Sequence, residues 1–254
     1  MTPRYAKAPI TEAILDLRVE PRPEASAIEI ATVFAELAAE LPKRQELPAD
    51  TGFQITFGSA GPPRLISGAV LGGFRYESAD GRRIVQARRD GFVFSLLPPY
   101  QDWQTFCAEA RPLWERYQAA WKPRKIIRVA LRYVNQFDFS DSPAVPPTQH
   151  FTIAPGPPAP GLLPVLELAG YSLQMMLPQP DIEAVAVVNH ALVPSPPGTV
   201  STVLDIDVFR EPLAWNPEDT AQLWNAMNEL RVRKNVLFEA CITPQTRQLL
   251  EPQE

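Results

Sequence analysis

The chain contains little cysteine and little histidine. Only two residues of each type occur among 254, and Cys107 and Cys241 lie far apart with no Cys-x-x-Cys spacing. So few thiols are typical of a protein in a reducing compartment, because secreted domains of modest size use denser disulfide frameworks. They also argue against a zinc site built from nitrogen and sulfur ligands. We therefore expect a cytoplasmic protein without disulfides and without a bound metal.

Long apolar runs are also absent. The first residues lack the hydrophobic stretch of a signal peptide. One long uncharged segment, residues 184–204, contains Asn189, His190, three prolines and a glycine. A membrane-spanning helix needs about 20 consecutive, predominantly apolar residues. We expect no membrane association.

An excess of positive charge is missing as well. The formal net charge is −5 and the isoelectric point is about 5.3. Proteins that bind nucleic acids usually have a strongly basic balance, so a nucleic-acid partner is not expected beyond a local basic patch. The hydrophobic content of 45% is that of an ordinary globular protein.

Familiar catalytic and cofactor motifs do not occur. The sequence has no glycine-rich phosphate loop, no Gly-x-Ser-x-Gly turn and no His-Glu-x-x-His pair. Its one glycine pair, Gly72-Gly73, precedes a predicted strand, whereas a phosphate site needs the N–H groups at the start of a helix. These absences favour a role without catalysis and without a cofactor.

Proline, by contrast, is abundant. There are 29 prolines, and eight of them lie between Pro143 and Pro164. Closely spaced prolines favour an extended backbone, because the ring fixes φ and removes the N–H donor. We expect residues 141–165 to connect an N-terminal half, 1–140, with a C-terminal half, 166–254. Whether the halves form one continuous domain is left open.

Two Asp-Gly dipeptides give the clearest local signal. Asp80-Gly81 and Asp90-Gly91 each separate two strand-like runs, and Asp-Gly supplies the positive φ angles of a tight hairpin turn. They predict an antiparallel meander with strands at Phe74–Ser78, Arg83–Arg89 and Phe92–Leu97. Alternating apolar residues predict further strands at Ile10–Val19, Phe53–Phe57, Lys125–Phe139, Leu163–Leu168, Tyr171–Leu177, Glu183–Leu192 and Ser201–Phe209.

Apolar residues spaced by three and four predict three amphipathic helices. The first covers Glu24–Leu41. The second is capped by Asp102, reaches about Trp121 and is expected to kink at Pro112. The third has Asn216 as N-cap and Pro217 as its first residue, and it reaches Cys241. The order of elements predicts an α+β protein with antiparallel sheet, helices packed on one face and a long C-terminal helix.

Short motifs spread along the chain form a recognisable set. They are Lys7-Ala8-Pro9-Ile10-Thr11-Glu12-Ala13, Leu131-Arg132-Tyr133-Val134-Asn135, Asn228, Phe238-Glu239 and Ile242-Thr243 through Arg247. With them the chain resembles a sporadically distributed, uncharacterised family of bacterial proteins that opens with such a motif. The resemblance implies no shared activity. The patchy distribution of that family is typical of accessory genes in specialised biosynthetic or defence clusters, which implies a partner-dependent binding protein.

Arginines are crowded on the predicted meander. An arginine fork binds carboxylate or phosphate groups through two bonds, so a strip of arginines is a candidate site for an acidic peptide or a nucleotide. Charges on strands more often form a solvated face or prevent pairing of sheet edges. The residues concerned are Arg75, Arg82, Arg83, Arg88 and Arg89.

One histidine and two carboxylates form the best catalytic candidate. Asp205 and Asp207 are two positions apart on one predicted strand, and His190 lies on the preceding strand. Together they could bind a metal or perform acid–base chemistry. The alternation of the strand favours a different interpretation, in which the aspartates face water and the neighbouring apolar residues face the core.

The sequence thus favours a non-catalytic accessory protein that binds a peptide or protein partner. One mode is addition of a strand to an exposed sheet edge, with the meander arginines selecting acidic residues. The alternative is a small-molecule enzyme or ligand carrier with a cavity between the sheet and the C-terminal helix, near His190. A homo-oligomer is compatible with both.

Overall fold

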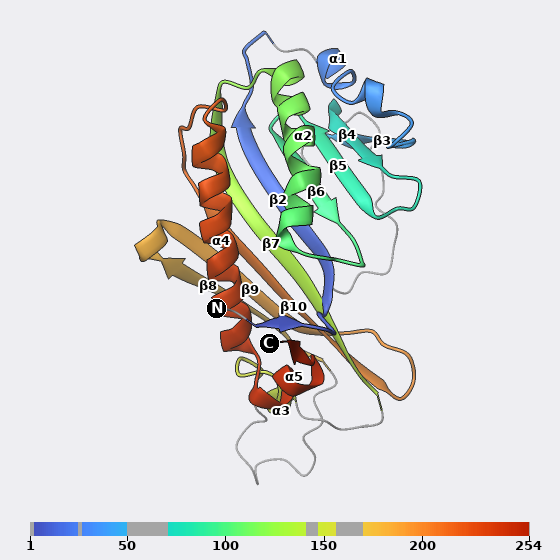
Figure 1. The fold of residues 1–254 in the computed structure, drawn as a ribbon, viewed down its shortest axis with the longest axis vertical. Helices are drawn as coiled ribbons and strands as arrows, with labels where there is room; N and C mark the ends of the chain where they lie inside the picture. Colours follow the sequence, from blue (N-terminus) through green and yellow to red (C-terminus); the bar gives the residue numbers. More distant parts are fainter. Residues whose placement is uncertain (1–2, 25–26, 50–70, 141–146, 156–169, 254) are drawn as a thin grey trace. The chain divides into compact units, whose positions relative to one another are not determined.

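The computed structural model describes residues 3–24, 27–49, 71–140, 147–155 and 170–253. These residues form an α+β protein around a large sheet (Figure 1), so the expected fold class is confirmed. The sheet order is β3 (Lys43–Pro48), β4 (Leu71–Glu77), β5 (Arg83–Arg88), β6 (Gly91–Leu96), β2 (Ile10–Glu20), β7 (Lys125–Ser140), β10 (Thr199–Arg210), β9 (Ala184–Val193) and β8 (Ser172–Gln179).

The remaining elements are helices and one small strand pair. β1 (Arg4–Tyr5) pairs antiparallel with β11 (Pro252–Gln253). The helices are α1 (Ala27–Ile30), α2 (Trp103–Trp121), α3 (Pro147–His150), α4 (Thr220–Cys241) and α5 (Pro244–Leu249), with 3₁₀ turns η1 (Ala35–Leu37) and η2 (Pro180–Ile182). No helix in the described ranges is long and apolar enough to cross a membrane.

The chain forms two compact units. The first unit comprises residues 1–11, 132–208 and 229–254, and the second comprises residues 12–131 and 209–228. Each unit takes residues from both sides of 141–165, so the units differ from the two halves expected from the proline-rich segment. The reason is that β2, β7, β10 and α4 are long elements whose two ends belong to different units.

The predicted meander lies in the second unit as β4, β5 and β6, paired antiparallel. Gly81 has a φ of 75°, which confirms the first turn. The second turn lies one residue earlier than predicted, because Arg88 pairs with Gly91 and leaves only Arg89 and Asp90 between the strands. Gly91 is a strand residue. Because it has no Cβ, the backbone of the neighbouring strand β2 can approach closely: a Cβ there would lie 2.4 Å from the Leu17 carbonyl oxygen.

Helix α2 packs on one face of this meander. Asp102 caps the helix as predicted, since its carboxylate accepts a bond of 2.7 Å from the N–H of Thr105. Phe106 contacts Phe94 and Trp114 contacts Phe92, at ring centroid distances of 5.2 and 5.8 Å. The helix continues through Pro112, whose side chain is exposed, and ends at Trp121.

The predicted helix over Glu24–Leu41 is wrong. Only α1 and η1 are helical there, and the bond from the Thr32 N–H to the Glu29 carbonyl closes a tighter turn. Four β-branched residues fall within positions 28–33, and such residues lose side-chain freedom in a helix. Val33, Phe34, Leu37 and Leu41 are still buried, so the apolar spacing identified core residues correctly and their backbone incorrectly.

The four strand predictions from Lys125 onward that fall within the described residues agree with the structure. β7, β8, β9 and β10 match the predicted runs within three residues. On one face of β7, Phe137 stacks near Phe238 of α4, with ring centroids 6.4 Å apart.

Helix α4 begins at Thr220, later than predicted. The Asp219 carboxylate accepts a bond of 2.9 Å from the Gln222 N–H, so Asp219 rather than Asn216 caps the helix.

Some predicted segments lie outside the described residues. These are the strands at Phe53–Phe57 and Leu163–Leu168 and most of the proline-rich connection. The part of the connection that is described, residues 147–155, contains α3, and its His150 and Phe151 are buried. There the expected extended backbone is replaced by a packed helical turn.

Candidate functional site

The meander arginines do not gather into one strip. Arg75 and Arg88 point to the same face of the sheet, and each is paired: Arg75 lies 2.9 Å from Glu77 and Arg88 lies 2.9 Å from Asp90. Arg83 points to the opposite face, because residues of a strand alternate. It lies 3.8 Å from Glu40.

The two other arginines serve the turns. Arg82 donates to the carbonyl oxygens of Pro98 and Pro99, at 3.1 and 2.9 Å. Arg89 is half-buried in the turn between β5 and β6, and its carbonyl accepts a bond from the Trp121 indole. The guanidinium groups are thus divided among two faces and two turns, an arrangement poorly suited to one acidic ligand.

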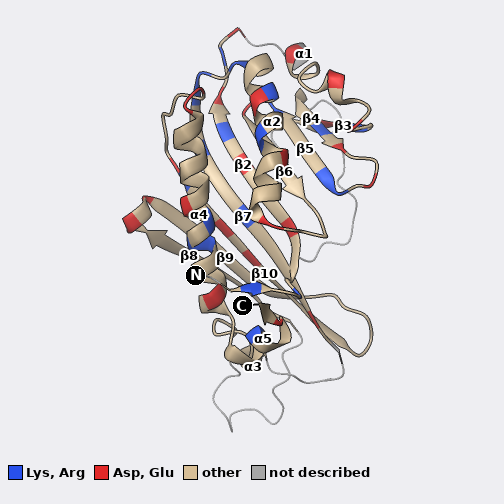
Figure 2. Cartoon of the chain, in the orientation of Figure 1, with Lys and Arg blue, Asp and Glu red and all other residues tan. Residues whose placement is uncertain are grey.

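Carboxylates also form ion pairs with arginines elsewhere in the second unit. Arg18 lies between Asp16 and Asp90, at 3.1 and 2.9 Å, and Arg128 lies between Asp16 and Glu211, at 3.3 and 3.4 Å. In Figure 2, β2 has both red and blue segments. Burial opposes ionisation of Asp90, but bonds and charge from Arg88 and the charge of Arg18 lower the pKa of its carboxyl.

Asp205 lies at the centre of a polar row in the first unit. Its carboxylate is fully buried and accepts two bonds of 2.7 Å from the Arg132 guanidinium and one of 3.0 Å from Asn189. Gln174 in turn donates to Asn189 at 2.8 Å. The expectation that Asp205 faces water is therefore wrong: it is buried because an arginine and an amide compensate its charge. Asp207 is half-buried, two positions along the same strand.

His190 lies on the other face of the sheet. It pairs with Leu173, whereas its neighbour Asn189 pairs with Gln174, so the side chains of His190 and Asn189 point in opposite directions. The structure therefore does not bring His190 together with the Asp205 row. No group of three His, Cys, Asp or Glu side chains within the described ranges could hold a metal ion.

Both histidines belong to a buried aromatic cluster of the first unit. His190 Nδ1 lies 3.0 Å from the Tyr171 hydroxyl, and its ring lies 4.2 Å from that of Phe151. The ring of His150 stacks on Phe139 at 4.1 Å. Burial lowers the pKa of His190 to about 4 and also lowers the pKa of His150. Both rings are therefore neutral at neutral pH.

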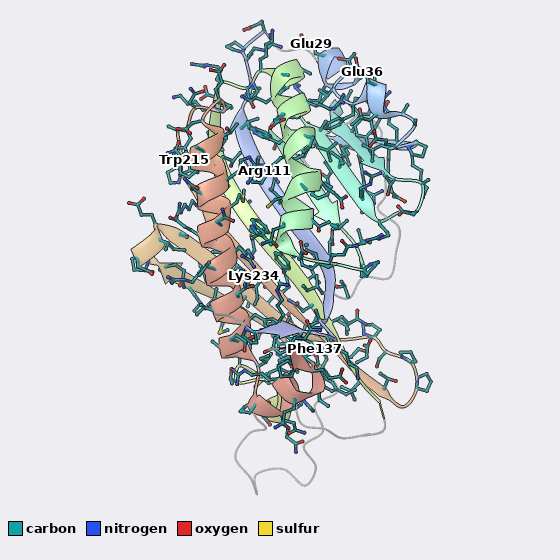
Figure 3. The ribbon with its side chains drawn as sticks, viewed as in Figure 1. Glu29, Glu36, Arg111, Phe137, Trp215 and Lys234 are labelled. Atoms are coloured by element: carbon teal, nitrogen blue, oxygen red, sulfur yellow. The ribbon has the colours of Figure 1, made fainter. Side chains whose placement is uncertain are left out.

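Lys234 is a buried cation that the sequence interpretation missed. Its ammonium nitrogen lies 3.7 Å from the centre of the Tyr133 ring, on the side of α4 that faces β7 (Figure 3). Burial, followed by the charge of Arg231, lowers its pKa to about 7. Its burial could have been predicted from the sequence, because Lys234 lies four residues after Leu230 and four before Phe238, within the apolar stripe of the helix.

Within the described residues, β8 is an edge strand with backbone groups that no neighbouring strand binds. Among the described strands, β8 pairs only with β9. The Leu192 N–H donates to the Tyr171 carbonyl at 3.2 Å, and in an antiparallel pair the residues that exchange bonds alternate. The N–H and C=O groups of Leu173, Met175 and Leu177 therefore point toward β9. Those of Ser172, Gln174 and Met176 point outward.

The side chains and charge of β8 also favour a partner strand. The eight residues of β8 have no charge, and exposed and half-buried residues alternate along it, with Met176 69% exposed. In Figure 2 the β8 arrow has neither red nor blue segments. Edge strands usually have charges or prolines that prevent pairing. β3, at the other end of the strand order, has Lys43, Arg44 and Pro48, whereas β8 has only Pro178.

No protein-family model matches this chain. No curated protein sequence matches it either, and the functional inference therefore depends on the residues themselves.

Proposed function

We propose that this chain is a non-catalytic binding protein that receives an extended segment of a protein partner along β8. Strand addition of this kind uses backbone hydrogen bonds for affinity and alternate side chains for specificity. In the resembled family, this role would be that of an accessory factor in a specialised biosynthetic or defence cluster. The observation that supports the proposal best is the uncharged edge with outward-pointing backbone groups at Ser172, Gln174 and Met176.

The side chains of β8 define what such a segment would contain. Leu173, Met175 and Leu177 form a half-buried row on one side of the strand, and Met176 lies beside Val187 on the other. A segment paired with β8 would place its own alternate residues beside these rows. Apolar residues would remove both surfaces from water. Arg75, Arg83 and Arg88 are paired with carboxylates, and Arg82 and Arg89 serve the turns. The meander arginines are therefore not part of this proposal, and it includes no preference for acidic segments.

The test uses a proline at the central outward-pointing position. Gln174→Pro removes an N–H that would bond the partner and leaves the backbone bonds between β8 and β9 in place. Gln174→Val is the matched control, because it also removes the amide side chain but keeps the N–H. Peptides selected from a random display library on the wild-type chain should bind Gln174→Val normally and Gln174→Pro at least about tenfold more weakly, a change of about 1.4 kcal/mol.

Two results would contradict the proposal. One is a library that yields no binding peptide. The other is a set of peptides that bind Gln174→Pro as well as they bind Gln174→Val. Circular dichroism of both variants establishes that the fold is retained.

A further inference from the structure

We infer that, when no partner segment occupies its edge, β8 pairs with the β8 strand of a second copy of this chain, as an antiparallel dimer with a two-fold axis at Gln174. The inference uses the same sheet edge as the proposed function but does not depend on it. It starts from the composition of the strand, Ser-Leu-Gln-Met-Met-Leu-Pro-Gln. Although the whole chain has a net charge of −5, two copies of this strand bring no like charges together.

The backbone pattern of β8 is self-complementary. Ser172, Gln174 and Met176 point their N–H and C=O groups outward. With the axis at Gln174, this residue pairs with Gln174 of the second copy, and Ser172 pairs with Met176 in both directions. Each of these pairs exchanges two hydrogen bonds, so every outward N–H from Ser172 to Met176 finds an acceptor.

Pro178 selects this register over its neighbours. It occupies an outward-pointing position, where its missing N–H does not weaken the bonding of β8 to β9. If the axis lay at Met175 or Met176, Ser172 or Gln174 would face Pro178 of the second copy, and each such pair would lose one bond. If the axis lay at Leu173 or Ser172, Met176 or Gln174 would face Gly170, which precedes the strand. The axis at Gln174 is the arrangement in which all paired residues lie within β8 and none is proline.

Side-chain packing supports the same arrangement. On one side the half-buried rows Leu173, Met175 and Leu177 of the two copies would lie side by side and extend one apolar surface across the junction. On the other side, Met176 would lie opposite Ser172 of the second copy, where the small serine leaves room for it. Met176 is the most exposed of the large apolar residues in the described ranges.

Cysteine cross-linking tests the register directly. Residues that form a hydrogen-bonded antiparallel pair have Cα atoms about 5.5 Å apart, within the range that a disulfide spans. Gln174→Cys should therefore give an intermolecular disulfide under mild oxidation. Ser172→Cys is the matched control, because Ser172 is not opposite itself in this register. The native Cys107 and Cys241 are buried.

The expected result is at least about tenfold more disulfide-linked dimer for Gln174→Cys than for Ser172→Cys, given the geometry a disulfide requires. In sedimentation experiments over a series of concentrations, the wild type and Gln174→Val should form dimers, and Gln174→Pro should remain monomeric. A wild-type chain that stays monomeric at every concentration would overturn the inference, as would cross-linking of Ser172→Cys in preference to Gln174→Cys. Peptide binding is a separate readout, so loss of the dimer with peptide binding retained would leave the proposed function standing.

Discussion

Lys234 shows how one residue can be tolerated at a position that its chemistry disfavours. A buried ammonium group is costly unless it is compensated. Here the face of the Tyr133 ring provides partial compensation through its negative quadrupole. Its pKa is lowered to about 7, so the amine is partly neutral at neutral pH.

Lys234→Met should change how stability depends on pH. The folded-state pKa of about 7 lies below the ordinary value of 10.5, so the unfolded chain binds more protons between these values and the free energy of unfolding rises with pH there. We expect the wild type to gain up to about 1.4 kcal/mol per pH unit above about pH 7. Lys234→Met should show almost no such gain.

Urea denaturation between about pH 6.5 and 8.5 measures this effect, a range that stays below the ordinary pKa of 9.0 of the Cys241 thiol. Lys125→Met, at an exposed position of β7, is the control and should keep the wild-type slope. An unchanged slope in Lys234→Met would show that another group titrates.

The two histidines should make the first unit sensitive to acid. Burial lowers the pKa of His190 from 6.5 to about 4, so the unfolded chain takes up a proton first as the pH falls. Stability is then lost between about pH 6.5 and 4, by up to about 1.4 kcal/mol per pH unit for each fully shifted histidine.

The variant His150→Gln/His190→Gln tests this expectation, because it removes every histidine of the chain. Its loss of stability over this range should be smaller than that of the wild type, as followed by circular dichroism in urea. The loss of stability of His190→Gln alone should lie between the losses of the wild type and the double variant. Identical curves for the wild type and the double variant would assign the acid sensitivity to carboxylates.

At the scale of single elements, local signals decided which predictions succeeded. The Asp80-Gly81 turn and the Asp102 cap depend on a few adjacent residues, and both were predictable from the sequence. The segment Glu24–Leu41 has helical spacing of apolar residues, yet its β-branched run and the tight turn at Thr32 leave only short helical pieces. The spacing of apolar residues indicates which side of a segment is buried, but it does not by itself determine which backbone hydrogen bonds form.

Pairs of residues distant in sequence were not predictable. Arg132 and Asp205 are 73 residues apart, and only the neighbouring positions of β7 and β10 in the sheet bring them together. The proposed catalytic trio failed for a related reason. Whether His190 and Asp205 share a face depends on the strand register, which alternation within one strand does not reveal.

The Arg132–Asp205 pair should contribute strongly to stability as a unit. Removing one partner of a buried pair leaves the other uncompensated, so Asp205→Asn and Arg132→Gln should each cost about 3 kcal/mol. The double variant should cost less than the sum of the two, with a coupling energy of about 1–3 kcal/mol. Urea denaturation of the four proteins completes the cycle. Additive losses would mean that each side chain acts through separate contacts.

At the scale of the whole molecule, the shared elements should make the two units unfold together. α4, β2, β7 and β10 each have one end in the first unit and the other end in the second, so disorder in one unit also disorders part of each of these elements. All five tryptophans lie in the second unit, whereas Cys241 lies in the first. These residues are natural, separate probes of the two units.

The variant Cys107→Ser leaves Cys241 as the single thiol. Tryptophan fluorescence and the labelling of Cys241 should report the same urea midpoint, as coincident probes do in a two-state transition. A labelling midpoint at clearly lower urea would show that the first unit opens by itself.

The difference between the two outer strands limits how far self-association can proceed. β8 is uncharged, while β3 has three charged residues, Lys43, Arg44 and Glu46, and a terminal proline. In a copy joined through β8, that strand is no longer free to pair. The charged residues and the proline of β3, at the other end of the strand order, disfavour pairing with a third copy. A like-to-like contact of this kind closes on itself. Concentrated solutions should therefore contain discrete pairs, with no growth into fibres.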